Sequence, residues 1–245
     1  SFINKRIKFI MAYTTINKST DYFNTKLYTG NGTTQAITGV GFQPDMVWAK
    51  CRAGTVNHGL ADAVRGATNQ LRPNDNSAEF TGGFVSFNAD GFSLNNNHNE
   101  NNSSQPYASW NWKANGAGSA NTSGSINSTV SVNQTAGFSI VKWTGNNGAG
   151  ATVGHGLGSI PKIVLVKNSQ QSGYDWVMYH ASLGNTKRIW LNLTNAVSTN
   201  TSSWNNTTPS NSLFTLGSSG ETNGSGEMIG YCFAEKTGYS KFGSW

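Results

Sequence analysis

The sequence predicts an all-β protein, a β-sandwich or jelly-roll-like fold made of two tandem related modules. Charged residues are only 11% of the chain, less than half of the roughly 25% usual for globular proteins. Long helices need Glu, Lys, Arg and Ala, whereas Gly, Asn, Ser and Thr favour turns. The 8 Trp, 8 Tyr and 12 Phe residues can fill a β core, which argues against a disordered chain.

An internal repeat organises the chain. Four segments recur in the same order: a Tyr/Trp-Thr-Gly-Asn segment, a Gly-x-Gly-x-x-Pro turn, an apolar strand that ends in lysine, and an aromatic closing strand. They are residues 28–32, 39–44, 45–50 and 107–112 in the first copy, and 143–147, 156–161, 162–167 and 228–233 in the second. Two copies of one supersecondary unit are the simplest explanation.

The repeat divides the chain into four parts. They are an N-terminal arm and lead-in strand (1–26), a first β module (27–114), a Gly/Ser/Asn-rich linker (115–136) and a second β module with a C-terminal strand (137–245). Within the linker, residues 125–132 alternate between polar and apolar side chains, which predicts an edge strand. Residues 238–245 resemble the strand that opens the second module, and this predicts the C-terminal strand.

Alternation along the strands predicts which side chains face inward. In the strand at 45–50, Met46 and Trp48 point to one face and Val47 to the other. Residues 163–166 are apolar on both faces, which is typical of a central strand. The glycines of the two Gly-x-Gly-x-x-Pro turns are expected to adopt positive φ angles, because these turns precede strands rather than the helix of a cofactor-binding loop.

The net charge of +6 does not by itself indicate a nucleic-acid partner. Most basic residues are scattered, and only Lys5, Arg6 and Lys8 gather near the N-terminus, where we expect an arm that docks on an acidic neighbouring subunit. No apolar run reaches the 18–20 residues or so of a membrane span, so no membrane insertion is expected. With two cysteines, Cys51 and Cys232, the sequence carries no disulfide framework.

The sequence does not predict an enzyme. No nucleophile elbow, zinc-binding helix, Cys-x-x-Cys pair or phosphate-binding loop occurs. The four histidines are far apart, and most acidic residues fall in turns or at strand ends, where solvated positions are expected. We therefore expect no catalytic residue, no cofactor and no metal. Weaker alternatives are a calcium site in the loops at 72–76 or 95–102 and a pair of carboxylates for glycoside cleavage.

Two loops suggest sugar binding, because aromatic rings stack on pyranoses while amides pair with hydroxyl groups. Packing within the loop or against another subunit remains the more common role for such residues. The candidate glycan contacts are Tyr174, Trp176, Trp204, Asn205 and Asn206, all expected in exposed loops.

Several motifs together resemble a known repeat domain. They are YTGNG at 28–32, FQPD at 42–45, VRGAT at 64–68, HGLG at 155–158, CFAE at 232–235 and GYSKFG at 238–243. This combination, over about residues 11–245, is similar to a domain of unknown function that is common in virion and tail-fibre-like proteins of marine bacteriophages. The resemblance implies a viral structural protein without catalytic residues.

From this resemblance we expect a non-enzymatic virion protein on the particle surface, either a tail fibre or appendage component or a capsid decoration. It would be made in the host cytoplasm and would assemble as a homo-oligomer, a trimer or larger, through contacts with other virion proteins. The alternative is a carbohydrate-binding module that recognises a host surface glycan.

Overall fold

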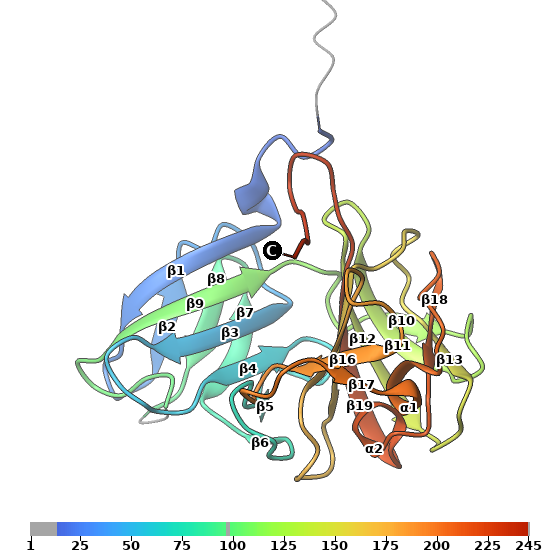
Figure 1. Cartoon of the computed structure of the whole chain (residues 1–245). Coiled ribbons are helices and arrows are strands. Elements are labelled where there is room, and N and C mark those ends of the chain that lie inside the picture. The colour runs from blue at the N-terminus through green and yellow to red at the C-terminus, as the bar shows by residue number, and fades with distance from the viewer. Residues whose placement is uncertain (1–13, 97–98, 245) are drawn as a thin grey trace, which may run out of the picture.

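The computed structural model describes residues 14–96 and 99–244. Strands account for 41% of the chain and helices for 5%, so the predicted all-β sandwich-like class is confirmed. None of the helices in the described residues has the length and apolar character needed to cross a bilayer. Several antiparallel sheets form the molecule, with strands β1 to β9 on one side and β10 to β19 on the other (Figure 1).

The first half contains a six-stranded sheet and a three-stranded sheet. The large sheet has the order β1 (Phe23–Thr29), β9 (Pro106–Trp112), β3 (Met46–Cys51), β4 (Gly59–Asp62), β5 (Asn69–Leu71) and β6 (Phe80–Thr81). The small sheet has the order β2 (Gln35–Thr38), β8 (Gly91–Leu94) and β7 (Phe84–Asn88). A short 3-10 helix, η1 (Ser19–Asp21), precedes β1.

The second half contains an eight-stranded sheet and a two-stranded sheet. The large sheet has the order β10 (Ser119–Asn121), β11 (Ser128–Asn133), β12 (Phe138–Gly145), β19 (Gly226–Phe233), β14 (Ile163–Asn168), β15 (Val177–His180), β16 (Lys187–Trp190) and β17 (Ser198–Thr199). The small sheet pairs β13 (Ala151–Gly154) with β18 (Leu213–Leu216). Two short helices are α1 (Thr201–Trp204) and α2 (Gly220–Asn223).

The strand orders of the two large sheets correspond. The order β1-β9-β3-β4-β5-β6 in the first sheet matches β12-β19-β14-β15-β16-β17 in the second, and the pair β2-β8 matches β13-β18. One difference stands out, because β11 and β10 continue the second sheet beyond β12, whereas β1 ends the first sheet. A shared strand order does not by itself divide a chain into domains, so the boundaries of the two modules stay a prediction.

Three cores hold the sheets together. One lies between the two sheets of the first half and includes Val47, and another packs the face of the eight-stranded sheet that carries Val164 against β13 and β18. The third joins the two large sheets and includes Met46 and Tyr231; we call it the seam. The alternation predicted at 45–50 is confirmed, because Met46 and Trp48 pack at the seam while Val47 faces the opposite core. Residues 163–166 likewise contribute to a core on each face.

Two predictions about strands need correction. The strand predicted at 125–132 is β11, but it pairs with β10 on one side and β12 on the other, so it is not an edge strand. The C-terminal strand predicted at 238–245 is absent from the described residues up to 244, which contain a turn closed by an isolated bridge between Lys236 and Ser240. The preceding strand, β19, is already paired on both sides, so it offers no free edge to the chain that follows.

Candidate binding pocket

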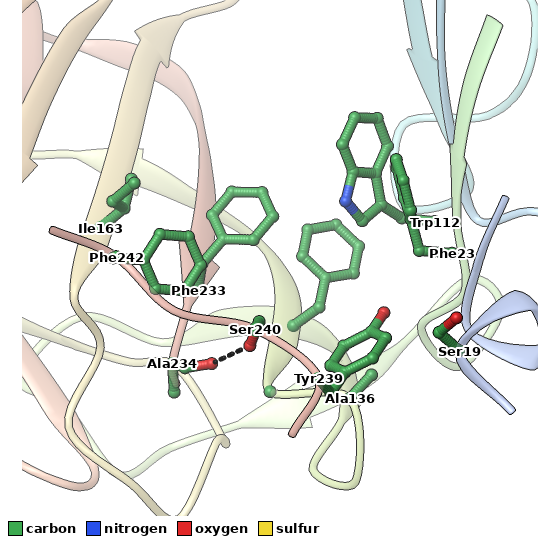
Figure 2. A pocket seen from close by; sticks show the side chains of 12 residues that line it. Ser19, Phe23, Trp112, Ala136, Ile163, Phe233, Ala234, Tyr239, Ser240 and Phe242 are labelled. Atoms are coloured by element: carbon green, nitrogen blue, oxygen red, sulfur yellow. Dashed lines mark hydrogen bonds between the residues drawn. The ribbon is translucent and has the colours of Figure 1, made fainter. Parts of the chain in front are cut away.

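A pocket of about 510 Å³ opens at one end of the seam. Figure 2 shows its walls: Phe23 and Trp112 come from the six-stranded sheet, while Ile163 and Phe233 come from the eight-stranded sheet. The segment after β19, dark red in Figure 1, lies between the two halves and closes one side. Six aromatic side chains line the pocket: Phe23, Trp112, Phe138, Phe233, Tyr239 and Phe242.

Strand register places the aromatic side chains at matching positions. Phe23 at the start of β1 pairs with Trp112 at the end of β9, and their ring centroids lie 5.0 Å apart. Phe138 at the start of β12 pairs with Phe233 at the end of β19, also with centroids 5.0 Å apart. Ile163, at the start of β14, is the other register partner of Phe233. Equivalent strand ends of the two large sheets therefore meet here.

The Trp112 ring joins the two pairs. Its centroid lies 6.3 Å from that of Phe138 and 6.4 Å from that of Phe233. Aromatic rings at such distances attract each other beyond the gain from burial. The wall that this cluster forms is continuous across the seam.

The C-terminal segment closes the pocket through local hydrogen bonds. The N–H groups of Tyr239 and Ser240 each donate to the Lys236 carbonyl at 2.9 Å, and the Phe242 N–H donates to the Glu235 carboxylate at 3.1 Å. The Ser240 hydroxyl donates to the Ala234 carbonyl at 3.4 Å (Figure 2). These bonds hold Tyr239 and Phe242 over the opening without a paired strand.

A glycine lets the turn before β12 lie close to the end of β19. Gly137 has a φ of +70°, and its carbonyl accepts the Ala234 N–H at 2.8 Å. A Cβ atom at this position would lie 2.5 Å from the Ala234 carbonyl oxygen. Both the backbone angle and the close approach therefore require glycine.

The pocket is poor in groups that could do acid–base chemistry. Among the described residues that line it, Tyr239 alone has a titratable side chain. Burial, together with the neighbouring Tyr22, raises the pKa of Tyr239 to about 12, so the phenol stays protonated at neutral pH. The other polar side-chain groups are the hydroxyls of Ser19 and Ser240 and the indole N–H of Trp112. Such a site suits the binding of an apolar group.

A buried polar cluster lies elsewhere in the seam. Asp62 accepts hydrogen bonds from Arg65 Nε and from the Tyr231 hydroxyl, both at 2.7 Å. Arg65 also pairs with Glu79 at 2.7 Å. Burial, and then the charge of Asp62, raises the pKa of Tyr231 well above its ordinary value, which keeps the hydroxyl a donor. Tyr231 belongs to β19, so the cluster ties the two large sheets together.

Three acidic residues are buried, and for them the expectation of solvated positions is wrong. They are Asp45, Asp62 and Glu100, which are 4%, 0% and 2% exposed. Each occurs beside backbone or side-chain donors from residues that are not its sequence neighbours, such as Ala114 N–H, which donates to Asp45 at 2.6 Å. In these three cases the carboxylate is covered by a strand or loop that lies elsewhere in the sequence and donates hydrogen bonds to it.

The candidate glycan contacts do not meet at the pocket, and two of them are buried. Trp176 is 0% exposed, stacks on Tyr231 and donates its indole N–H to the Arg72 carbonyl at 2.9 Å. Trp204 is 1% exposed and packs edge-on against Tyr179. The expectation that these two rings are exposed is wrong, because partners distant in sequence cover them.

The other three candidate glycan contacts are not buried, and they lie in two separate segments. Tyr174 is half-buried, and its ring lies against Gly220 of α2. Asn205 and Asn206 are exposed after α1, both with left-handed backbone angles. None of the three lines the aromatic pocket. The basic arm residues, Lys5, Arg6 and Lys8, lie outside the described residues.

Within residues 14–96 and 99–244, no group of three or more His, Cys, Asp or Glu side chains is arranged to hold a metal ion. In the loop at 72–76, the Asp75 carboxylate accepts the Ser77 N–H at 2.9 Å and lies 3.5 Å from Arg72. This carboxylate is therefore occupied by the loop's own donors.

The aromatic pocket was not predicted from the sequence. The signal was present in the repeat, because the aligned closing strands end in Trp112 and Phe233, and both opening strands begin with phenylalanine. Taken singly, each aromatic residue looks like ordinary core. What the repeat alone does not reveal is that equivalent strand ends lie next to each other.

The profile of a family described as "Domain of unknown function (DUF7483)" matches residues 18–245. No curated protein and no solved structure matches the chain. Since the match covers nearly the whole chain, the protein belongs to the DUF7483 family, a domain of unknown function.

Proposed function

We propose that this chain is a non-enzymatic structural protein of a bacteriophage virion. It would lie on the particle surface, as a tail appendage or capsid decoration component, and assemble through contacts with other virion proteins. The motifs shared with virion and tail-fibre-like repeat domains suggest the viral setting. The aromatic pocket is the observation that supports the other two parts of the proposal, namely that the protein is not an enzyme and that it assembles with other proteins.

The pocket favours docking over catalysis. Its volume of about 510 Å³ falls in the range of 300–1,000 Å³ or so that is typical of binding sites. Acid–base catalysis needs titratable groups that change charge near neutral pH, but the described residues that line this pocket offer only the hydroxyls of Ser19 and Ser240, the indole N–H of Trp112 and the protonated Tyr239. Large apolar side chains from a partner protein would be desolvated here without leaving a charge unpaired.

The carbohydrate-binding alternative is weaker in the loops first considered for it. Stacking on a pyranose needs an accessible ring face, and the rings of Trp176 and Trp204 are covered by the protein itself. Specific binding of the purified chain to a glycan array, lost in an Asn205→Ala, Asn206→Ala double variant, would nevertheless favour this alternative.

Cryo-electron microscopy of particles from a phage that encodes the chain tests the proposal. Density for the chain on the capsid or tail is expected. A Phe242→Asp variant should be incorporated poorly, because it places a charge in the pocket wall, whereas Val197→Asp, at an exposed side chain outside the pocket, should be incorporated normally. Particles that lack the chain would overturn the virion assignment. Normal incorporation of Phe242→Asp, with folding verified by circular dichroism, would overturn the role of the pocket.

A further inference from the structure

Strand β1 is the longest sheet edge in the described chain. It has seven residues, whereas the edge strands β6 and β17 have two each and β10 has three. The edges of the small sheets are four or five residues long, and the longest of these, β7, has an irregular register against its neighbour. Short edges and bulges are common protections against unwanted pairing. Strand β1 has neither protection and contains no proline; its one charged residue is Lys26, a residue type that also protects edges.

The second large sheet shows what can occupy such an edge. Its strand β12 corresponds to β1 in strand order, but β12 is paired on its outer side with β11 over six residue pairs. No described strand takes the corresponding place beside β1. The same arrangement therefore accepts an added antiparallel strand in one half and leaves that place open in the other.

Hydrogen bonds at the two ends of β1 show which backbone groups face the open side. The Lys113 N–H donates to the Tyr22 carbonyl, and the Gly30 N–H donates to the Gln105 carbonyl, both at 2.9 Å. Residues of antiparallel strands alternate between facing one neighbour and facing the other. The backbone groups of even-numbered residues in β1 therefore face β9, and those of odd-numbered residues, including Leu27, face away from it.

The side chain of Leu27 is unusually exposed for an apolar residue in a strand. It is 60% exposed, the highest value among the large apolar side chains described as exposed. Two outward groups already have side-chain partners, because the Thr25 N–H donates to Asn24 Oδ1 at 2.9 Å and the Thr29 carbonyl accepts the Gln35 amide at 3.1 Å. A strand added beside β1 would cover part of the Leu27 side chain and pair with the outward backbone groups of Leu27, and it would replace these two side-chain contacts with backbone ones. The edge and the side chain thus point to the same contact.

We propose that the free edge of β1 pairs antiparallel with β1 of a second copy of this chain. Two copies related by a two-fold axis would then join their six-stranded sheets into one continuous sheet. The contact is isologous, so one edge supplies both surfaces.

The side chains favour one register. Placing Leu27 opposite Leu27 of the second copy sets Lys26 opposite Tyr28, and Thr25 opposite Thr29. Shifting the axis to Lys26 would set two lysines directly opposite each other, which destabilises an antiparallel pair. The Leu27 register buries the exposed leucines against each other, and this self-complementarity is why a second copy is the occupant.

Sedimentation velocity of the full chain over two decades of concentration tests the contact. A monomer–dimer equilibrium is expected, and Leu27→Lys should weaken it by about tenfold or more, because it replaces the leucine pair with two like charges. Ile160→Lys is the matched control, since Ile160 is 50% exposed and lies outside the strands. A wild-type chain that stays monomeric, or a Leu27→Lys chain that dimerises as well as wild type, would overturn the proposal.

Hydrogen exchange at single amides separates this contact from other occupants of the edge. The Leu27 amide should become protected as the concentration rises, whereas the Lys26 and Tyr28 amides, which face β9, should be protected throughout. Protection of Leu27 that is independent of concentration would assign the edge to a segment of the same chain and contradict the proposal. The dimer names a partner for the assembly role proposed above but is measured on the isolated chain, so particle localisation can fail independently.

Discussion

Glu100 is a carboxyl group held in a place that disfavours its charge. It is 2% exposed, Oε1 accepts the Gln70 amide at 2.5 Å, and Oε2 has no hydrogen-bond partner among the described residues. Burial raises its pKa from 4.5 to about 7. Since the folded protein holds this proton more tightly than the unfolded chain, Glu100 contributes full stability below about pH 4.5 and loses it as the pH rises through 7.

This predicts that Glu100→Gln removes a pH dependence. Between pH 4.5 and 7, Glu100 alone should lower the wild-type free energy of unfolding by about 3 kcal/mol at most, because each unit of pKa shift corresponds to about 1.4 kcal/mol. The neutral amide should flatten this slope and make the variant the more stable protein at pH 8. Urea unfolding at pH 5 and pH 8 measures the effect, with exposed Glu227→Gln as control. Equal slopes in wild type and Glu100→Gln would contradict the assignment.

Gly137 allows a separate test of the pocket's geometry. Gly137→Ala adds both a strained backbone angle and a contact with the Ala234 carbonyl, and Gly173→Ala, with a φ of +87° and nothing within 4 Å, adds the strain alone. Strain of this kind costs about 1 kcal/mol. We expect Gly137→Ala to lower the free energy of unfolding by clearly more than Gly173→Ala does. Equal losses in thermal or urea unfolding would mean that the turn relaxes and the close approach is unimportant.

At the scale of elements, local backbone conformation could be predicted from the sequence, whereas the contacts between segments distant in the sequence could not. The positive φ angles expected in the Gly-x-Gly-x-x-Pro turns are confirmed at Gly39, Gly41, Gly156 and Gly158, because this property depends on the turn alone. The burial of Trp176 was not predictable, because the carbonyl that accepts its indole N–H belongs to a residue 104 positions away. The prediction of a C-terminal strand was wrong for a related reason. A strand needs a neighbouring strand with a free edge, and the alternation of side chains does not show whether such an edge exists.

Asp45 holds the segment that connects β9, the last strand of the first half, to β10. Its carboxylate accepts the Ala114 N–H at 2.6 Å and the Gly116 N–H at 3.0 Å, just before β10. Asp45→Ala should therefore leave two backbone donors without this acceptor and lower the free energy of unfolding by about 2 kcal/mol or more. Asp21→Ala, whose partner Lys18 is an exposed side chain, should change it by less than about 0.5 kcal/mol in the same urea titration. Similar losses in both variants would contradict the role of Asp45.

At the scale of the molecule, the seam decides whether the two halves unfold together. Its core takes Met46, Leu60 and Leu71 from the six-stranded sheet and Phe138 and Ile140 from the eight-stranded sheet, with their side chains buried against one another. Separating the halves would expose these side chains and break the hydrogen bond from Tyr231 to Asp62. A single cooperative transition is therefore expected by calorimetry, with equal calorimetric and van't Hoff enthalpies.

Two substitutions in the buried polar cluster of Asp62, Arg65 and Tyr231 should differ in whether the two halves unfold in one transition or in two. Arg65→Met keeps much of the side-chain volume but leaves the fully buried Asp62 without its cation, which should cost about 3–5 kcal/mol. Tyr231→Phe removes two hydrogen bonds across the seam, a short one to Asp62 at 2.7 Å and a long one from Arg65 Nη2 at 3.5 Å, and should cost about 1–3 kcal/mol. Because Asp62 and Arg65 both belong to the first half, Arg65→Met should lower the stability of that half most and separate the calorimetric transition into two. Tyr231→Phe should keep one transition at a lower temperature, since the apolar part of the seam remains. Two transitions already in the wild type would show that burial at the seam is too weak to couple the halves.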